Sequence, residues 1–343
     1  MRKLLNTLYV TNPDIYLSRE NEAVVAKLDG EVVMRVPALN LEGIVCFNRM
    51  GASTYLMQLC AEQNIGLCFL SPHGRFMARI TGPVNGNVLL RRTQYRIADD
   101  EGKSLDLMQY IIAGKIFNSR KIIERFKRDY GATKDTVHIE EVSRQLDRYR
   151  RLCLTAASMD ILRGIEGEAG ALYFSVFDEM IIAQKHEFVF HGRNRRPPKD
   201  RVNSLLSFFY TLLGHEVQSA LETVGLDPYV GFMHSDRPGR AGLALDLMEE
   251  LRGYLADRMV LTMINRGQVA PDDFIDNGIE NIVMTDGGKR KVLSAWQQKK
   301  KEMITHPFLN EKMPIGLIPY VQAKLLAKYL RGDLEHYPVF LIQ

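Results

Sequence analysis

AVVAKLDGEVVMRVP, at residues 23–37, decides how the first part of this chain folds. Two valine-rich runs flank Asp29–Gly30, and a two-residue Asp-Gly connection predicts a β-hairpin because glycine accepts the positive φ that such turns require. Strand-like stretches continue on both sides of the hairpin, at residues 8–12, 15–20, 43–47, 66–70 and 75–80. A short helix is expected over residues 52–64. The opening part of the chain therefore predicts a β-sheet domain.

The pattern changes after PVNGN at residues 83–87, where proline, glycine and asparagine mark a loop. Long stretches with helical periodicity follow, at residues 105–130, 139–163 and 204–224. Strands followed by helices favour segregated domains over a doubly wound sheet. We therefore expect an α+β fold, with an N-terminal β-sheet domain over residues 1–85 and a larger all-α domain over residues 86–343.

The composition is that of an ordinary globular chain of 343 residues, with 46% hydrophobic and 25% charged residues. No apolar run approaches the roughly 20 residues needed to cross a bilayer, and the first residues do not resemble a signal peptide. We therefore expect a cytoplasmic protein with no membrane partner. The four cysteines lack C-x-x-C spacing, so we expect reduced core residues and no zinc site.

A candidate metal site lies in DPYVGFMHSDRPGRAGLALDLMEELR, residues 227–252. His234 stands in a loop rich in glycine and proline, and Asp246 and Glu249 follow in a segment with helical spacing. At about 100° per residue these two acids point roughly 60° apart, so both can face one cation. Carboxylates with one imidazole suit Mg²⁺ or Mn²⁺. Acids opposite an apolar stripe are also typical of a solvated helix face.

Another acid stands in GIEGEAGALYF, residues 164–174. Glycine recurs at every third position of this otherwise helical segment, although each glycine costs about 1 kcal/mol relative to alanine in a helix interior. A face of small residues lets another backbone or a substrate come close, and Glu166 would point into that contact. Tight packing between two helices is the alternative explanation.

Five stretches resemble one known family and cover nearly the whole chain. They are LYVTNPDIYLSRENEAVV near the start, AGKIFNSRKII at 113–123, GIEGEAGALYF, NRRPPKDRVNSLLSFFYTLLGHE at 194–216 and HPFLNEKMPIGLIPYVQAKLLAKYLRGD at 306–333. The family is the CRISPR spacer-acquisition integrase and endonuclease, the first-numbered of the CRISPR-associated proteins. Where the family often has a proline after the PP-x-D segment, this chain has Arg201. The C-terminal region looks most like the branch that accompanies type I-C systems.

The resemblance implies a metal-dependent DNA integrase and endonuclease. Glu166, His234 and Glu249 match the family's ligands for Mg²⁺ or Mn²⁺, Asp246 matches an acid that supports catalysis, and Glu250 is expected to matter little. The 3′-hydroxyl of a short foreign DNA fragment would attack a phosphodiester at the edge of a CRISPR repeat. The resemblance also implies a homodimer joined through the β-domains, and a heterohexamer in which a small second adaptation protein bridges two such dimers. A stand-alone nuclease acting on branched DNA in repair needs the same ligands and is the alternative.

Basic residues gather in clusters, although the formal net charge is only +4. Such clusters can neutralise phosphates and release counterions. The candidate DNA contacts come from a helical stretch and from a proline-rich loop, and they are Lys115, Arg120, Arg193, Arg195, Arg196, Lys199 and Asn203. A solvated basic surface without a role in DNA binding gives the same pattern.

Overall fold

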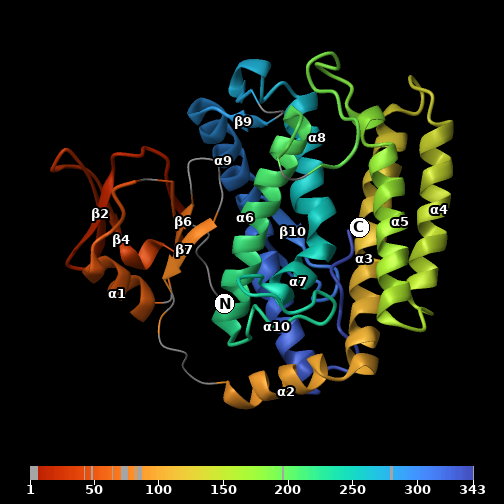
Figure 1. Cartoon of the computed structure of the whole chain (residues 1–343), viewed down its shortest axis with the longest axis horizontal. Helices are drawn as coiled ribbons and strands as arrows, with labels where there is room; N and C mark the ends of the chain where they lie inside the picture. The colour runs from red at the N-terminus through yellow and green to blue at the C-terminus, as the bar shows by residue number, and fades with distance from the viewer. Residues whose placement is uncertain are drawn as a thin grey trace. The chain divides into compact units, whose positions relative to one another are not determined.

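The computed structural model describes residues 7–41, 43–47, 49–63, 65–70, 76–80, 82, 87–194, 197–278 and 281–342. The chain divides into two compact units, and Figure 1 labels most of their helices and several of their strands. The first unit takes in residues 1–85, 284–302 and 314–317, and the second takes in residues 86–283, 303–313 and 318–343. Helix α9 (Asp286–Lys301) therefore belongs to the first unit, whereas the boundary expected from the sequence assigns it to the helical part.

The first unit contains two sheets and helix α1 (Thr54–Glu62). Its strands are β1 (Thr7–Val10), β2 (Tyr16–Glu20), β3 (Ala23–Leu28), β4 (Glu31–Pro37), β5 (Gly43–Cys46), β6 (Gly66–Leu70) and β7 (Phe76–Ile80). Strands β2, β3 and β4 form an antiparallel sheet. The other sheet has the order β1-β5-β6-β7, with β7 antiparallel to its parallel neighbours. Parallel pairing of β5 with β6 requires a crossover connection, which α1 supplies.

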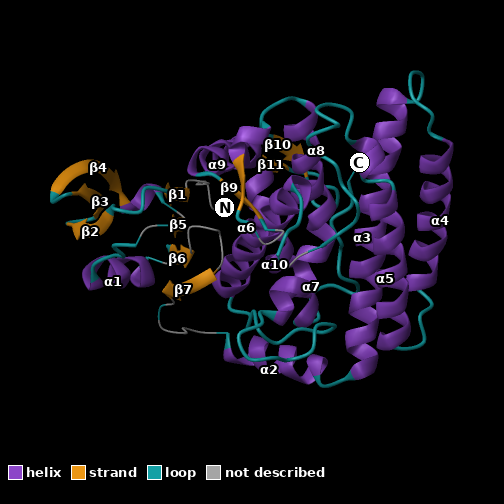
Figure 2. Cartoon of the chain, turned by 45° about the horizontal axis from the view of Figure 1, so that its top comes forward, coloured by secondary structure: helices purple, strands orange, loops and turns teal. Residues whose placement is uncertain are grey.

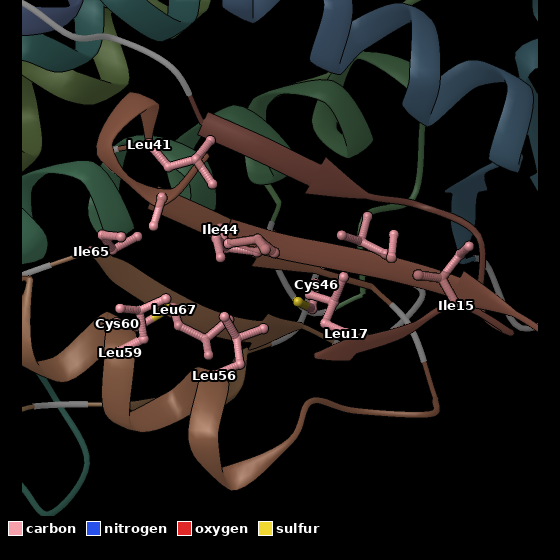
Figure 3. Close-up of a cluster of buried hydrophobic side chains, with 14 residues drawn as sticks. Ile15, Leu17, Leu41, Ile44, Cys46, Leu56, Leu59, Cys60, Ile65 and Leu67 are labelled. Atoms are coloured by element: carbon pink, nitrogen blue, oxygen red, sulfur yellow. The ribbon is translucent and has the colours of Figure 1, made fainter. Parts of the chain in front are cut away.

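The β-hairpin with a two-residue turn at Asp29–Gly30 is confirmed. Leu28 pairs with Glu31, and the turn residues Asp29 and Gly30 have φ angles of 51° and 88°. Figure 3 shows the apolar core that the alternating strand residues form with α1. Its fully buried members include Leu17, Ile44, Leu56 and Leu67.

The second unit is mostly helical. Its helices are α2 (Val88–Ala98), α3 (Glu101–Tyr130), α4 (Val137–Cys153), α5 (Met159–Ser175), α6 (Arg201–Val224), α7 (Gly242–Arg252), α8 (Arg258–Asn265) and α10 (Ile318–Leu330). Four short strands interrupt the helical part, with β8 (Phe274–Asp276) paired to β9 (Ile282–Met284) and β10 (Met303–Thr305) paired to β11 (Lys312–Pro314). The all-α expectation is corrected accordingly, because strands of three residues are too short to show a period-two pattern. None of the helices in the described residues is long and apolar enough to cross a membrane.

The single helix expected over residues 139–163 is wrong. Helix α4 ends at Cys153, and α5 begins at Met159 after a turn. Ser158 caps α5, since its Oγ accepts a hydrogen bond from the backbone N–H of Ile161 at 3.3 Å. The turn folds α5 back, so that α3, α4 and α5 lie side by side in Figures 1 and 2. This arrangement brings Glu166 on α5 next to α3.

Candidate active site

Charged side chains from α3, α5 and α7 meet in the second unit. The Nζ of Lys115 on α3 lies 2.7 Å from Oε2 of Glu249 on α7, and it also forms an ion pair with Glu166 on α5. Arg252 Nη1 lies 3.0 Å from the other oxygen of Glu249. Burial of Glu249 would raise its pKa, but Arg252 and Lys115 lower that pKa to about 2. The Glu249 carboxylate is therefore ionised and held by two cations.

Asp246 holds the loop that carries His234. Its buried carboxylate accepts hydrogen bonds from the backbone N–H groups of Phe232 at 2.6 Å, Met233 at 3.1 Å and His234 at 3.2 Å. The Nδ1 atom of His234 lies 2.5 Å from Asp246 Oδ1. Because Nδ1 is engaged by Asp246, Nε2 is the ring nitrogen left for another partner.

Gln94 on α2 also holds this loop in place through hydrogen bonds to its backbone. The fully buried Gln94 amide donates hydrogen bonds to the carbonyl oxygens of Asp227 at 2.7 Å and Val230 at 2.8 Å. Close packing also shapes the loop, since a Cβ at Gly231 would lie 2.7 Å from Asp246 Oδ2. This role of Gln94 was not expected from the sequence, because nothing in the local pattern connects Gln94 to residues far along the chain.

A cavity of about 600 Å³ opens beside Glu166. Gly167 and Gly170 line it on the same helix. A Cβ built at Gly164, Gly167 or Gly170 meets no atom of the described residues within 4 Å. Tight helix packing, the alternative explanation for these glycines, is therefore wrong. They leave open space next to the acid.

The lining of the cavity also includes basic and aromatic residues. The guanidinium groups of Arg193 and Arg252 lie 5.3 Å and 5.1 Å from the ring centroid of Tyr210, whose hydroxyl donates a hydrogen bond to Asp257 at 2.6 Å. Asp257 ends a π-helical turn, Gly253–Asp257, that follows α7. Burial raises the pKa of Asp257 to about 6, against the opposing effect of Tyr210 and Arg252.

Three of these lining residues were not expected from the sequence. Arg252 could have been found, because it follows Glu249 by three positions on the same helix face. Tyr210 and Asp257 show no such signal, since a tyrosine and an acid in apolar helical segments look like ordinary packing residues.

The expected metal ligands Glu166, His234 and Glu249 lie near one another, but they are not arranged as a metal-binding site in this structure. Among the residues that the structure describes, no three His, Cys, Asp or Glu side chains are grouped closely enough to hold a metal ion. Glu166 and Glu249 share Lys115, and His234 is close enough to contribute to the low pKa of Glu249. Lys115 was expected to contact DNA, but its side chain is only 15% exposed and its ammonium group lies between the two carboxylates.

Arg120 and Lys199, two other candidate DNA contacts, differ in how far they are exposed. Arg120 on α3 is paired with Asp147 on α4 at 3.0 Å. Lys199 is exposed in the loop before α6. Arg195 and Arg196 lie outside the described residues.

Arg193 and Asn203 bind each other. Arg193 Nη1 donates a hydrogen bond to Asn203 Oδ1 at 2.6 Å, and Asn203 Nδ2 donates to the carbonyl oxygen of Gly192 at 2.9 Å. Asn203 is fully buried, so it joins the loop to the start of α6 and does not reach DNA. The expectation of a DNA contact at Asn203 is therefore corrected.

Glu250, which the sequence analysis expected to matter little, is also fully buried. It accepts hydrogen bonds from Tyr337 Oη at 2.5 Å, from the backbone N–H of Phe340 at 2.5 Å and from Gln322 Nε2 at 3.0 Å. Burial raises its pKa to about 7, although these donors favour the charged form. Removing its carboxylate would leave buried donors without a partner, so Glu250→Ala is expected to lower stability. The milder loss of activity expected of Glu250→Ala than of Glu249→Ala stays a prediction.

The family model described as CRISPR associated protein Cas1 matches residues 8–298. The chain belongs to this family. A relative from Chlorobaculum tepidum, named CRISPR-associated endonuclease Cas1 1, is 47% identical over 341 residues, which cover 99% of each chain. The family expected from the sequence is confirmed.

Two solved structures share the fold of this Cas1 family member at 21% identity. One is a casposase bound to integration product, with a TM-score of 0.82 over 96% of this chain and 92% of that chain. The other belongs to a Cas6-RT-Cas1–Cas2 complex, with a TM-score of 0.83 over 98% of this chain and 36% of that chain.

Proposed function

We propose that this member of the Cas1 family is a metal-dependent DNA integrase and endonuclease of CRISPR adaptation. The observation that supports it best is the convergence of Glu166 and Glu249, from different helices, on one cationic group beside an open cavity. The 3′-hydroxyl of a short foreign DNA fragment attacks a phosphodiester at the edge of a CRISPR repeat. A P–O bond forms between the 3′-oxygen of the fragment and the phosphorus, and the attacking hydroxyl loses its proton. The bond from phosphorus to the 3′-oxygen of the flanking strand breaks, and that oxygen takes up a proton. Water in place of the hydroxyl gives strand cleavage.

The donor set fits Mg²⁺ or Mn²⁺. Glu166 and Glu249 would supply carboxylate oxygens, and His234 would supply Nε2, since Asp246 already engages Nδ1. Lys115 occupies this place with a single positive charge, because its ammonium group contacts both carboxylates. When bound, a divalent cation at these residues would polarise the scissile phosphate and stabilise the departing oxygen.

The surrounding side chains prepare the site. Asp246 fixes the ring orientation of His234 and the backbone of its loop. Arg252 keeps Glu249 ionised. Arg193, stacked on Tyr210, presents positive charge to the cavity, where a phosphate group would be stabilised.

The proposed partners are double-stranded DNA with splayed ends, a second copy of the chain and a small second adaptation protein. A homodimer through the β-domains is supported by edge strand β4, where Val32, Val33 and Met34 are 47%, 54% and 48% exposed. An apolar edge strand is normally covered. The shared fold with a chain of a Cas1–Cas2 complex is compatible with the heterohexamer. Assignment to the type I-C branch rests on the resemblance, and the neighbouring genes would test it.

Substitution of the ligands tests the chemistry. Glu166→Ala, His234→Ala and Glu249→Ala should each abolish joining and cutting of DNA, while duplex binding persists because dispersed Lys and Arg side chains provide it. Glu168→Ala is the matched control, since Glu168 is an exposed acid on the same helix. Substantial Mg²⁺- or Mn²⁺-dependent activity in any of the three variants would remove that residue from the site.

A joining assay separates integration from the alternative of a stand-alone repair nuclease. The purified chain and its small partner are mixed with a labelled 3′-hydroxyl oligonucleotide and repeat DNA. Covalent transfer of the label into the repeat strand supports the integrase. Cutting of branched DNA without any transfer would favour the repair nuclease.

A further inference from the structure

The segment 337–342, which we name the strap, passes between α3 and α7 directly behind the site. Tyr337 and Phe340 of the strap are buried. Both bind the carboxylate of Glu250 on α7, through the Tyr337 hydroxyl and the Phe340 backbone N–H. Gln322 on α10 donates to the same carboxylate at 3.0 Å and to the carbonyl oxygen of Pro338 at 3.2 Å. The strap is therefore joined to α7 by direct and bridging hydrogen bonds.

On α3, Asn118 binds the strap and α7 together. Its Nδ2 donates hydrogen bonds to the carbonyl oxygens of Phe340 at 2.8 Å and Glu250 at 2.7 Å. Its Oδ1 accepts a hydrogen bond from the backbone N–H of Ile342 at 2.9 Å. Asn118 is fully buried, so losing any of these bonds leaves a polar group without solvent to replace its partner.

Gly114 lets the strap pass close to α3. A Cβ at this glycine would lie 2.1 Å from Cγ1 of Val339 and 3.3 Å from its Cβ. Such an approach forbids any side chain at position 114 unless the strap moves, because the branched valine side chain has few rotamers.

Each helix uses adjacent residues for the strap and for the site. On α3, Gly114 contacts the strap and Lys115 faces the carboxylates; on α7, Glu250 binds the strap and Glu249 faces Lys115. We infer that the strap is a positioning element, which holds α7 against α3 so that the carboxylate of Glu249 stays near that of Glu166 at the site. This inference rests on the proposed function for the metal role of Glu249.

Gly114→Ala in the full chain tests the strap. The added methyl group should displace Val339 while improving the intrinsic helix propensity of α3. We expect Mn²⁺ affinity, measured by electron paramagnetic resonance, to weaken by about 10-fold, as is usual when the support of a metal ligand is lost. The kcat of DNA cleavage should fall with little change in KM. Amide hydrogen exchange should become faster in the strap and in residues 247–252.

The double variant Gly114→Ala/Val339→Ala should recover most of the loss, because removing Cγ1 makes room for the new methyl group. Val339→Ala alone and the exposed-residue control Glu335→Gln should behave like the wild type. Should Gly114→Ala fail to fold, Tyr337→Phe removes one hydrogen bond to Glu250 and should show the same fall in kcat and Mn²⁺ affinity.

Two results would overturn the inference: unchanged Mn²⁺ affinity and kcat in a folded variant whose strap exchanges faster, or a loss that Val339→Ala does not reverse. If the wild-type chain binds no Mn²⁺ and cuts no DNA, the proposed function fails. The strap is then judged by hydrogen exchange alone, and unchanged protection of residues 247–252 in Gly114→Ala overturns it.

Discussion

Lys115 compensates two carboxylates that would otherwise repel each other at the site. A divalent cation bound by Glu166 and Glu249 must compete with this ammonium group. We expect Lys115→Met to bind Mn²⁺ more tightly by roughly 10-fold, because about 1.4 kcal/mol is a modest estimate for the lost competition. Titration followed by electron paramagnetic resonance measures the change.

Lys121→Met is the control for that titration, since Lys121 is an exposed residue of the same helix. Weaker Mn²⁺ binding by Lys115→Met would contradict competition and make the lysine a supporter of the metal. The sequence could not reveal this role, because a lysine in a basic helical stretch gives the same pattern at a DNA surface as at a buried ion pair. Only the packing of α3 against α5 and α7 distinguishes the two.

The raised pKa of Asp257 predicts how the free energy of unfolding depends on pH. Burial raises its pKa from 3.8 to about 6, so the folded chain keeps a proton that the unfolded chain has already released. This contribution to stability is therefore complete below about pH 4 and is lost as pH rises through about 6, by up to about 3 kcal/mol. In Asp257→Asn the part of the fall that comes from Asp257 should be absent, while the part from Glu250, whose pKa is raised to about 7, should remain. Urea unfolding over roughly pH 4 to 7 checks it, and parallel profiles for variant and wild type would refute the assignment.

Among the helices, α5 has a face of glycines, Gly164, Gly167 and Gly170, that leaves open space beside Glu166. Gly170→Leu should fill part of the cavity and reduce cutting and joining, while thermal stability stays equal or rises because glycine is a poor helix former. Gly164→Leu is the matched control, since Gly164 has similar open space but does not line the cavity. Equal activity in the two variants would show that substrate does not occupy this space. Cleavage rates and melting temperatures decide it.

The elements themselves were largely predictable from local chemistry. The β3–β4 hairpin follows from Asp29–Gly30, and the positions of α3 and α6 follow from helical periodicity. The break between α4 and α5 was not predictable from glycine or proline, because neither occurs there. Ser158 is a weak signal, since serine is common in many settings besides the helix N-cap.

For the whole molecule, the exposed apolar side chains of edge strand β4 predict that two copies of the chain associate through this strand. Val33→Lys should convert the proposed dimer to a monomer without unfolding the first unit, because the side chain is already more than half exposed. Sedimentation velocity measures the mass. Gln58→Lys adds the same single positive charge at an exposed position of α1 and should leave the dimer intact. A dimeric Val33→Lys chain would place the interface elsewhere.

The site was only partly predictable, because its residues come from distant parts of the chain. Local motifs pointed to Glu166, His234, Asp246 and Glu249. They did not reveal that Asp246 turns inward to hold the loop, or that Glu250 binds the strap. These roles depend on how far each helix is rotated about its axis when it packs, and several rotations are compatible with one hydrophobic pattern.

The ion-paired side chains of the site have a consequence for the order of events. Lys115, Glu166, Glu249 and Arg252 carry opposite charges that cancel. This group therefore exerts little net pull on a phosphate until a divalent cation adds its own charge. We expect the metal to bind first and the nucleic acid strand to enter the cavity second. A chain depleted of metal would then hold DNA at its outer surface while leaving every phosphodiester uncut.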